Sequence, residues 1–170
     1  MRTRPAPAAG RVRPLSNAMI PSDHFVRFYN EVFKFLEARD PSLETLKDYY
    51  REISEAPNPR RDEFFKHGLH GMCEYWDMIR VEENCDLEIH EFPDHAEFRM
   101  RKCPSLSKVT DNDAGPYARY CHHCPGWVIP AVERAGCVCE FNIENRFKPT
   151  CSWKIYPGDS GKTSRALEEE

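Results

Sequence analysis

The sequence lacks any long apolar run, and no stretch of its 170 residues approaches the roughly 20 residues that a membrane-spanning helix needs. Residues 1–20 contain no acidic side chain and no hydrophobic segment like that of a secretory signal peptide. The sequence also has no internal repeat. We therefore expect a protein located in the cytoplasm, without a membrane partner.

Disulfide bonds are not expected either, although the chain contains eight cysteines. Disulfides persist in oxidising compartments, and the sequence carries no signal that directs the chain to one. We therefore expect reduced thiols, which are available as metal ligands or as nucleophiles.

The chain has little net charge for its size, −4 in total. Four arginines lie in residues 1–20, so the acidic excess belongs to the rest of the chain. This balance excludes the strongly basic surface of a nucleic-acid-binding domain, and we expect no nucleic-acid partner. The hydrophobic fraction of 40% is enough for one buried core and excludes wholesale disorder.

The composition divides the chain into one domain and two tails. Residues 1–20 are rich in Pro, Ala and Arg and are expected to form a disordered tail. Residues 157–170 are expected to form a polar C-terminal tail. Residues 21–156 carry the periodic apolar patterns, and we expect them to form a single domain.

Apolar residues at helical spacing predict three helices in the N-terminal half of this domain. The first begins after Ser22, and the second follows Asp40, with a proline at its first helical position. The third runs from about residue 61 to residue 79. Gly68 and Gly71 weaken this third helix, or allow another backbone to come close to it.

Period-two alternation predicts four strands in the C-terminal half, at residues 87–92, 96–101, 137–144 and 151–156. The first two and the last two each form a hairpin. Between the hairpins we expect a loop over residues 103–115, followed by two short helices that Pro125 and Gly126 separate. The expected fold is therefore α+β, with the N-terminal helices packed on a four-stranded antiparallel sheet made of two hairpins.

The clearest chemical motif is Cys121-His122-His123-Cys124. Two cysteines at this spacing on a helical turn present both sulfurs on one side, which suits a soft metal ion or a dithiol redox pair. A zinc site needs two more ligands, and Cys103 and Cys151 are the candidates for them. The expected cofactor is therefore zinc or another soft transition metal, or none if these thiols have another role.

Cys103 has a second interpretation, because it lies at the end of a predicted strand, before a proline. A cysteine held on rigid backbone can act as a nucleophile if a base or a positive charge lies near it. Arg101, His122 and His123 are the candidates for that group. The plainer interpretation is a buried thiol without a reaction to perform.

A third candidate site lies on the polar face of the predicted third helix, where Glu63, His67, His70 and Glu74 share one side. Two histidines and two carboxylates can hold a metal ion or move protons. We take His67, His70 and Glu74 as candidate catalytic groups beside Cys103. The alternative is an ordinary solvated helix face.

The cysteine-containing half of the chain resembles the family of L-2-amino-thiazoline-4-carboxylic acid hydrolase-like proteins. The resemblance covers about residues 60–156, and it depends on the spacing of five short segments. They are Cys103-Pro104, Tyr120 to Cys124, Glu133 to Gly136, Arg146, and Cys151 to Trp153. The chain is similar, more distantly, to 4-vinyl reductase-like domains, which bind small ligands.

The first resemblance implies ring-opening hydrolysis of a cyclic C–N bond in a sulfur-containing amino-acid precursor. It marks Cys103, Cys121, Cys124 and Cys151 as functional positions. Two functions are therefore expected. One is a small hydrolase that acts on a small-molecule substrate with a cysteine thiolate or a metal-bound water. The other is a non-catalytic sensor domain that binds zinc or a ligand and in which the cysteines are structural.

Overall fold

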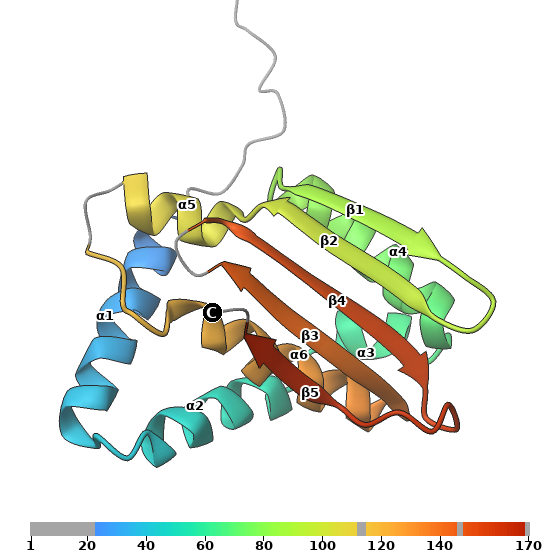
Figure 1. Cartoon of the computed structure of the whole chain (residues 1–170), viewed down its shortest axis with the longest axis horizontal. Coiled ribbons are helices and arrows are strands. Elements are labelled where there is room, and N and C mark those ends of the chain that lie inside the picture. The colour runs from blue at the N-terminus through green and yellow to red at the C-terminus, as the bar shows by residue number, and fades with distance from the viewer. Residues whose placement is uncertain (1–22, 112–114, 146–147, 169–170) are drawn as a thin grey trace, which may run out of the picture.

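The computed structural model describes residues 23–111, 115–145 and 148–168. The predicted tail over residues 1–20 lies outside these described residues, as does Arg146. Figure 1 shows the chain as one layer of helices beside one twisted sheet. None of the helices in the described part of the chain is both long enough and apolar enough to cross a membrane.

Six α-helices and one short 3₁₀-helix are present in the described residues. They are α1 (Asp23–Arg39), α2 (Glu44–Glu55), α3 (Pro59–Phe65), α4 (Gly68–Glu82), α5 (Pro104–Asp111), the 3₁₀-helix η1 (Tyr120–His122) and α6 (His123–Arg134). Five strands form the sheet: β1 (Asp86–Glu91), β2 (Ala96–Lys102), β3 (Cys137–Asn145), β4 (Thr150–Pro157) and β5 (Arg165–Glu168).

The sheet has the strand order β1-β2-β4-β3-β5, and the two predicted hairpins lie side by side in it. The α+β class is confirmed, but the prediction of four antiparallel strands is incomplete, because β5 pairs with β3 in parallel. β5 comes from the segment that was expected to be a polar tail. Its sequence has no clear alternation, and polar contacts attach it to the edge: the Oγ atom of Ser164 accepts from the backbone N–H of Cys139 at 3.1 Å, and Arg165 pairs with Glu140 at 2.6 Å.

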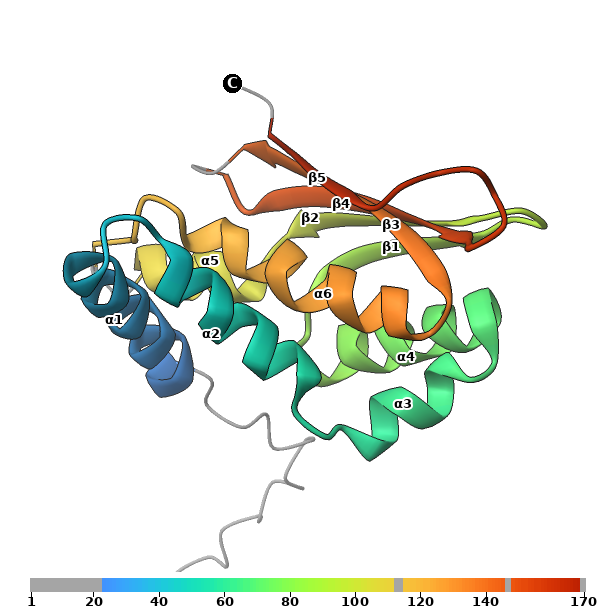
Figure 2. The same ribbon diagram turned by 90° about the horizontal axis from the view of Figure 1, so that it is seen from below.

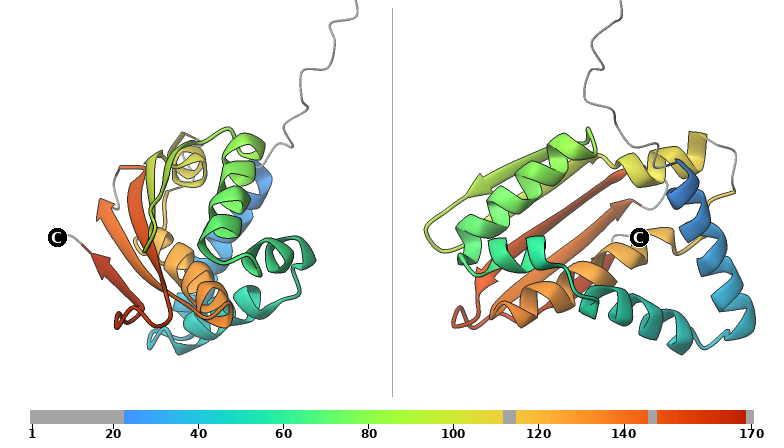
Figure 3. Two further views of the ribbon diagram at one scale, coloured as in Figure 1. Left: turned by 90° about the vertical axis from the view of Figure 1, so that its right-hand side faces the viewer. Right: turned by 180° about the vertical axis from the view of Figure 1, so that it is seen from behind.

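The helices lie on one side of the sheet, as Figures 2 and 3 show. Alternation along the strands directs apolar side chains to that side and charged ones away from it. Trp153 of β4 stacks between Phe98 of β2 and Phe141 of β3, with ring centroids 5.1 and 5.4 Å away. Trp76 of α4 packs on this row, 4.9 Å from Phe98. This aromatic row forms the centre of the main core.

A second core cluster lies beyond the end of the sheet at which β2 ends and β4 begins (Figure 1). Its fully or nearly fully buried members come from α1, α2, α5 and the segment around η1, and they include Phe33, Tyr50, Leu106 and Tyr120. The side chain of Cys121 packs against both clusters. Cys121, a residue of the Cys121–Cys124 motif, therefore lies where the two cores meet.

The predicted third helix is in fact two helices, α3 and α4. The break has a physical cause at Gly68, whose φ of +63° belongs to the left-handed region that ends helices. Gly71 allows another backbone to come close to the helix, as the second interpretation expected. A Cβ atom there would lie 1.9 Å from the carbonyl oxygen of Phe64. The two glycines thus let α3 turn back closely onto α4.

Two further helix predictions were wrong. The expected loop over residues 103–115 contains α5, in which Leu106 and Val109 are buried at helical spacing. Pro125 and Gly126 do not interrupt α6, because Pro125 lies in its first turn, where a backbone N–H has no partner within the helix. Gly126 is in contact with the Tyr50 ring, and a Cβ atom there would lie 2.9 Å from it.

Candidate functional site

Separate segments of the chain meet at one corner of the sheet and bring four cysteines together. Cys103 follows the last residue of β2, and Cys151 is the second residue of β4, the neighbour of β2. The backbone N–H of Cys103 donates to the carbonyl oxygen of Pro149 at 2.7 Å, which holds the end of β2 against the start of β4. Cys121 and Cys124 come from η1 and the first turn of α6. We call these four residues the cysteine cluster.

The cysteine cluster lines one narrow space of about 20 Å³, which we call the cysteine cavity. Leu106, Phe141 and Ile143 supply apolar walls to it, and His123 also lines it. Such a volume has room for about one water molecule and none for a substrate. The four cysteines that the sequence grouped therefore also line the same cavity in the structure.

Three of the four thiols of the cluster are held in their neutral form. Burial raises the pKa of Cys103, Cys124 and Cys151 above the ordinary value of 9.0. The other cysteines of the cluster raise the pKa of Cys124 and Cys151 further, because neighbouring thiolates would repel each other. Backbone N–H groups at the start of α5 oppose the shift at Cys103, and that of Leu106 lies 3.5 Å from its Sγ atom. None of these three thiols is therefore poised as a thiolate.

His123 is a buried base beside the cluster. Its Nδ1 atom contacts the carbonyl oxygen of Tyr120, so Nδ1 carries the proton, and its Nε2 atom is 3.3 Å from the Sγ atom of Cys124. Burial lowers the pKa of His123 from 6.5 to about 4. Arg101, another candidate partner for Cys103, instead forms an ion pair with Glu88 at 2.6 Å.

The cysteine cluster has the donor chemistry of a zinc site. Four sulfur donors are the ligand set of a tetrahedral zinc site. In the described parts of the chain, however, no group of three or more His, Cys, Asp or Glu side chains is placed so that it could hold a metal ion. A zinc site at the cysteine cluster therefore stays a prediction.

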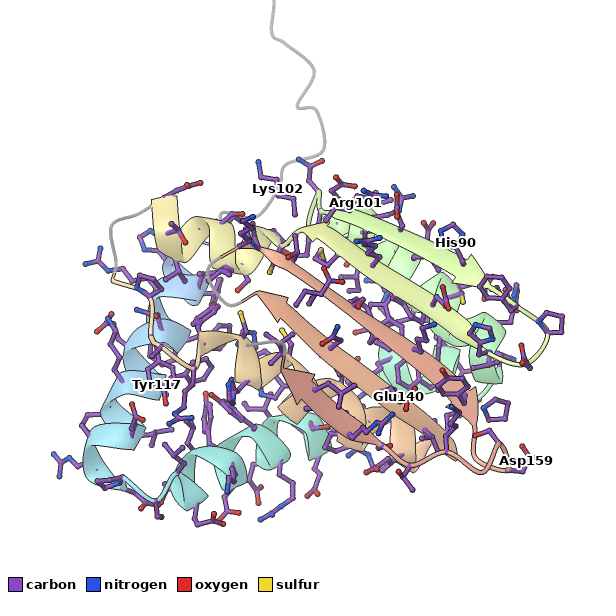
Figure 4. All side chains as sticks on the ribbon, viewed as in Figure 1. His90, Arg101, Lys102, Tyr117, Glu140 and Asp159 are labelled. Carbon is purple, nitrogen blue, oxygen red and sulfur yellow. The ribbon has the colours of Figure 1, made fainter. Side chains whose placement is uncertain are left out.

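The polar groups of the predicted third helix lie far from the cysteine cluster. His70 of α4 is 3.0 Å from Glu91 at the end of β1 and 3.7 Å from Glu74. The hairpin register pairs Glu91 with Ala96, while Cys103 follows the other end of β2, seven residue steps from Ala96 or about 23 Å away. Figure 4 shows the same separation, with His90 at one end of the hairpin and Arg101 and Lys102 at the other.

These polar groups behave as a solvated surface. His70 is 66% exposed, and Glu91 raises its pKa by accepting a hydrogen bond from it. His67 is exposed at the start of α4, and Glu63 belongs to α3, where it pairs with Lys66 at 2.7 Å. The structure thus does not bring His67, His70 or Glu74 to Cys103, and the break between α3 and α4 separates Glu63 from the others.

A much larger hollow of about 540 Å³ lies on the other side of η1 and the start of α6, and we call it the α2–α6 groove. Its wall is mainly apolar and comes from α2, the segment around η1, α6 and the sheet edge at β3 and β5. The lining residues are Leu43, Leu46, Lys47, Tyr50, Arg119, His122, Pro125, Gly126, Ile129, Pro130, Ile143 and Ala166. Pockets of about 300 to 1,000 Å³ are typical binding sites for small molecules.

One short wall divides the groove from the cysteine cavity. Along the η1–α6 turn, His122 and Pro125 line the groove, while Cys121, His123 and Cys124 line the cysteine cavity. Ile143 of β3 lines both spaces. The position of the turn therefore shapes the two spaces together.

Sequence reasoning missed the groove, although it assigned some of its residues. Leu43, Leu46 and Tyr50 lie at helical spacing after Asp40, and the N-terminal helices were expected to pack on the sheet. Part of this face instead remains open, because α2 packs along α6 and β5 lies at the sheet edge. The packing of α2 along α6 cannot be predicted from the apolar pattern of either segment alone.

Comparison with known proteins gave no relative: no family model and no curated protein matches this chain. The resemblance to the hydrolase-like family therefore stays a hypothesis.

Proposed function

We propose that this chain is a binding domain for a small, mainly apolar molecule, with the ligand held in the α2–α6 groove. The observation that carries the proposal is the groove itself, a hollow of about 540 Å³ with a mainly apolar wall. Burial of apolar surface is the main favourable term in binding such molecules. The proposal corresponds to the non-catalytic alternative expected from the sequence.

The separation of the groove from the thiols supports binding over catalysis. The cysteine cavity has a volume of about 20 Å³ and admits no substrate. Neutral thiols are poor nucleophiles, and the pKa of Cys103 is raised by burial. The cluster instead supplies packing behind the groove, where Cys121 contacts both cores. A metal ion at these four thiols stays a separate prediction, and ligand binding in the groove does not depend on it.

Hydrolysis of a cyclic C–N bond is the second candidate, and one observation favours it. The unprotonated Nε2 atom of His123 is 3.3 Å from the thiol of Cys124, in the same cavity as Cys103. A nucleophile beside a base that a third group orients is a recurrent catalytic arrangement. This function requires the cavity to open to substrate.

Hydrolysis has a direct test. The protein is incubated with L-2-amino-thiazoline-4-carboxylic acid, and mass spectrometry follows the addition of one water molecule to it. Activity that is lost in both Cys124→Ser and Cys103→Ser would favour the hydrolase. Absence of turnover by the native protein removes this assignment.

The binding proposal is tested by filling the groove. Ala166 is exposed on β5 and lines the groove, so Ala166→Trp introduces a bulky ring into it without disturbing a core. Val81 of α4 is also exposed and does not line the groove, so Val81→Trp is the matched control. Isothermal titration with octanol, a neutral apolar probe, should show binding to the native protein and to Val81→Trp, and none to Ala166→Trp. Equal binding by all three would refute the proposal.

A further inference from the structure

We propose that the α2–α6 groove selects an anionic ligand, a small apolar carboxylate whose head group lies beside Lys47, Arg119 and His122. This inference rests on the proposed binding function and adds the chemical class of the ligand. The sequence suggested no function for Lys47 and Arg119, and it suggested His122 only as a partner of Cys103.

The register between the two helices brings the basic residues to one end of the groove. The Oγ atom of Ser54 in α2 donates to the carbonyl oxygen of Trp127 in α6 at 2.8 Å. Earlier in both helices, the Tyr50 ring is in contact with Gly126. The helices therefore run in the same direction, and Lys47, one turn before Tyr50, is level with the start of α6, which His122 directly precedes.

Arg119 reaches the same end from the segment before η1. It lies 3.5 Å from Glu37 near the end of α1, the helix that leads into α2. Arg119 and His122 are one turn apart, and both line the groove. Three basic side chains from two segments thus converge at the end where α2 and α6 begin.

The rest of the groove is unsuited to a strongly polar ligand. Ile129, Pro130 and Ala166 line it farther along α6 and at the sheet edge, and Ile143 closes its inner side. None of the lining residues in the described part of the chain is acidic. An anionic head with an apolar body matches both parts, because the charge contacts cations while the body is removed from water. An amine would place like charges together.

The carboxylates that now pair with these cations lie outside the groove. Glu44 is 2.7 Å from Lys47, and Glu37 is 3.5 Å from Arg119, and in both pairs the side chains are well exposed. Exposed ion pairs of this kind contribute little to stability and exchange readily. A ligand carboxylate that also buries its apolar body in the groove can therefore take the place of Glu44 and Glu37.

The test compares three probes of equal chain length by isothermal titration: octanoate, octanol and octylamine. Octanoate should bind at least about tenfold more tightly than octanol, as expected for hydrogen bonds to a charged group, and octylamine more weakly than both. The double variant Lys47→Met/Arg119→Met should bring octanoate to the affinity of octanol without changing octanol binding.

Lys66→Met is the matched control. Lys66 pairs with Glu63 three residues before it at 2.7 Å, as Lys47 pairs with Glu44, and the two lysines are 68% and 64% exposed. Lys66 does not line the groove, so its loss should leave the preference for octanoate unchanged. If octanol binds as tightly as octanoate, the selection of anions is wrong and the binding function stands. If none of the probes binds, both proposals fail.

Discussion

The Nε2 atom of His123 and the Sγ atom of Cys124 lie 3.3 Å apart, and both groups are held in their neutral forms. The pKa of the imidazole is lowered to about 4 and that of the thiol is raised, in each case mainly by burial. Proton transfer from thiol to imidazole would create two buried charges, which is unfavourable in these surroundings. The pair therefore stabilises the turn between η1 and α6 and does not generate a thiolate.

The neutral state of His123 predicts a loss of stability in weak acid. Its pKa is about 4 in the folded chain and 6.5 in ordinary surroundings, so between these values the unfolded chain binds the additional proton. The free energy of unfolding should fall by about 2 kcal/mol as the pH decreases from 7 to 5, and it should be unaffected by this group above pH 7. Urea denaturation at a series of pH values measures the slope.

His123→Asn should remove this slope, because its amide can still donate to the carbonyl oxygen of Tyr120 but does not titrate. His90→Asn, at an exposed position on β1, is the control and should keep the slope. Glu91 raises the pKa of His70, so His70 contributes to the pH dependence of stability with the opposite sign. Because both variants keep His70, this contribution cancels when they are compared. An unchanged slope in His123→Asn would show that folding does not lower the pKa of His123.

Gly71→Ala should destabilise the protein, against the usual effect of such a change in a helix. Alanine is normally the better helix former, by about 1 kcal/mol. Here its Cβ atom would lie 1.9 Å from the carbonyl oxygen of Phe64, so α3 must move away from α4. We expect a net loss of about 2 kcal/mol in the free energy of unfolding.

Gly68→Ala separates this steric effect from a backbone effect at the same junction. Gly68 has a φ of +63° and no atom within 4 Å of the added Cβ position, so only conformational strain is expected, about 1 kcal/mol. Urea denaturation of both variants gives the comparison. A Gly71→Ala variant as stable as the native protein would mean that α3 and α4 do not pack as described.

The strands could be predicted from the sequence because their information is local. Alternating apolar and polar residues define both hairpins, and Phe98, Phe141 and Trp153 all belong to inward-facing positions. The cysteine cluster could be anticipated for a related reason. Antiparallel pairing places the end of one strand beside the start of another, and Cys103 and Cys151 occupy these positions.

The remaining features depend on contacts between distant segments. The division of the predicted third helix depends on the backbone conformation of Gly68, and a glycine in a helical pattern has more than one explanation. β5 has a short polar sequence and exists through its pairing with β3. The α2–α6 groove arises where Tyr50 and Gly126 set the spacing of two helices, which no periodicity records.

Thiol counting should find all eight cysteines free, because none forms a disulfide in the structure. An aromatic disulfide reagent, applied under denaturing, non-reducing conditions, should release eight equivalents, the same as a reduced sample. In the native protein at neutral pH, Cys103, Cys124 and Cys151 should react slowly, since burial raises the pKa of each. Fewer than eight equivalents in the unreduced sample would contradict the expectation of a reducing environment.

The last prediction concerns Ile143, whose side chain lines both the α2–α6 groove and the cysteine cavity. Ile143→Ala removes part of the wall between them, so the cluster should become accessible from the groove. We expect the native rate of thiol labelling to rise at least about tenfold, and a groove ligand such as octanol to reverse the increase. The loss of a buried isoleucine side chain should also cost about 2 to 4 kcal/mol in stability.

Ile155→Ala controls for that loss of stability, because Ile155 is also a fully buried isoleucine of the sheet but lines neither space. If labelling depended on global unfolding, the two variants would react at rates that follow their stabilities, and octanol would protect them only through stability. If labelling depends on the wall at residue 143, Ile143→Ala reacts faster than Ile155→Ala. The two variants are compared at urea concentrations that give them the same free energy of unfolding. Equal rates under those conditions would show that the groove and the cysteine cavity are not connected through Ile143.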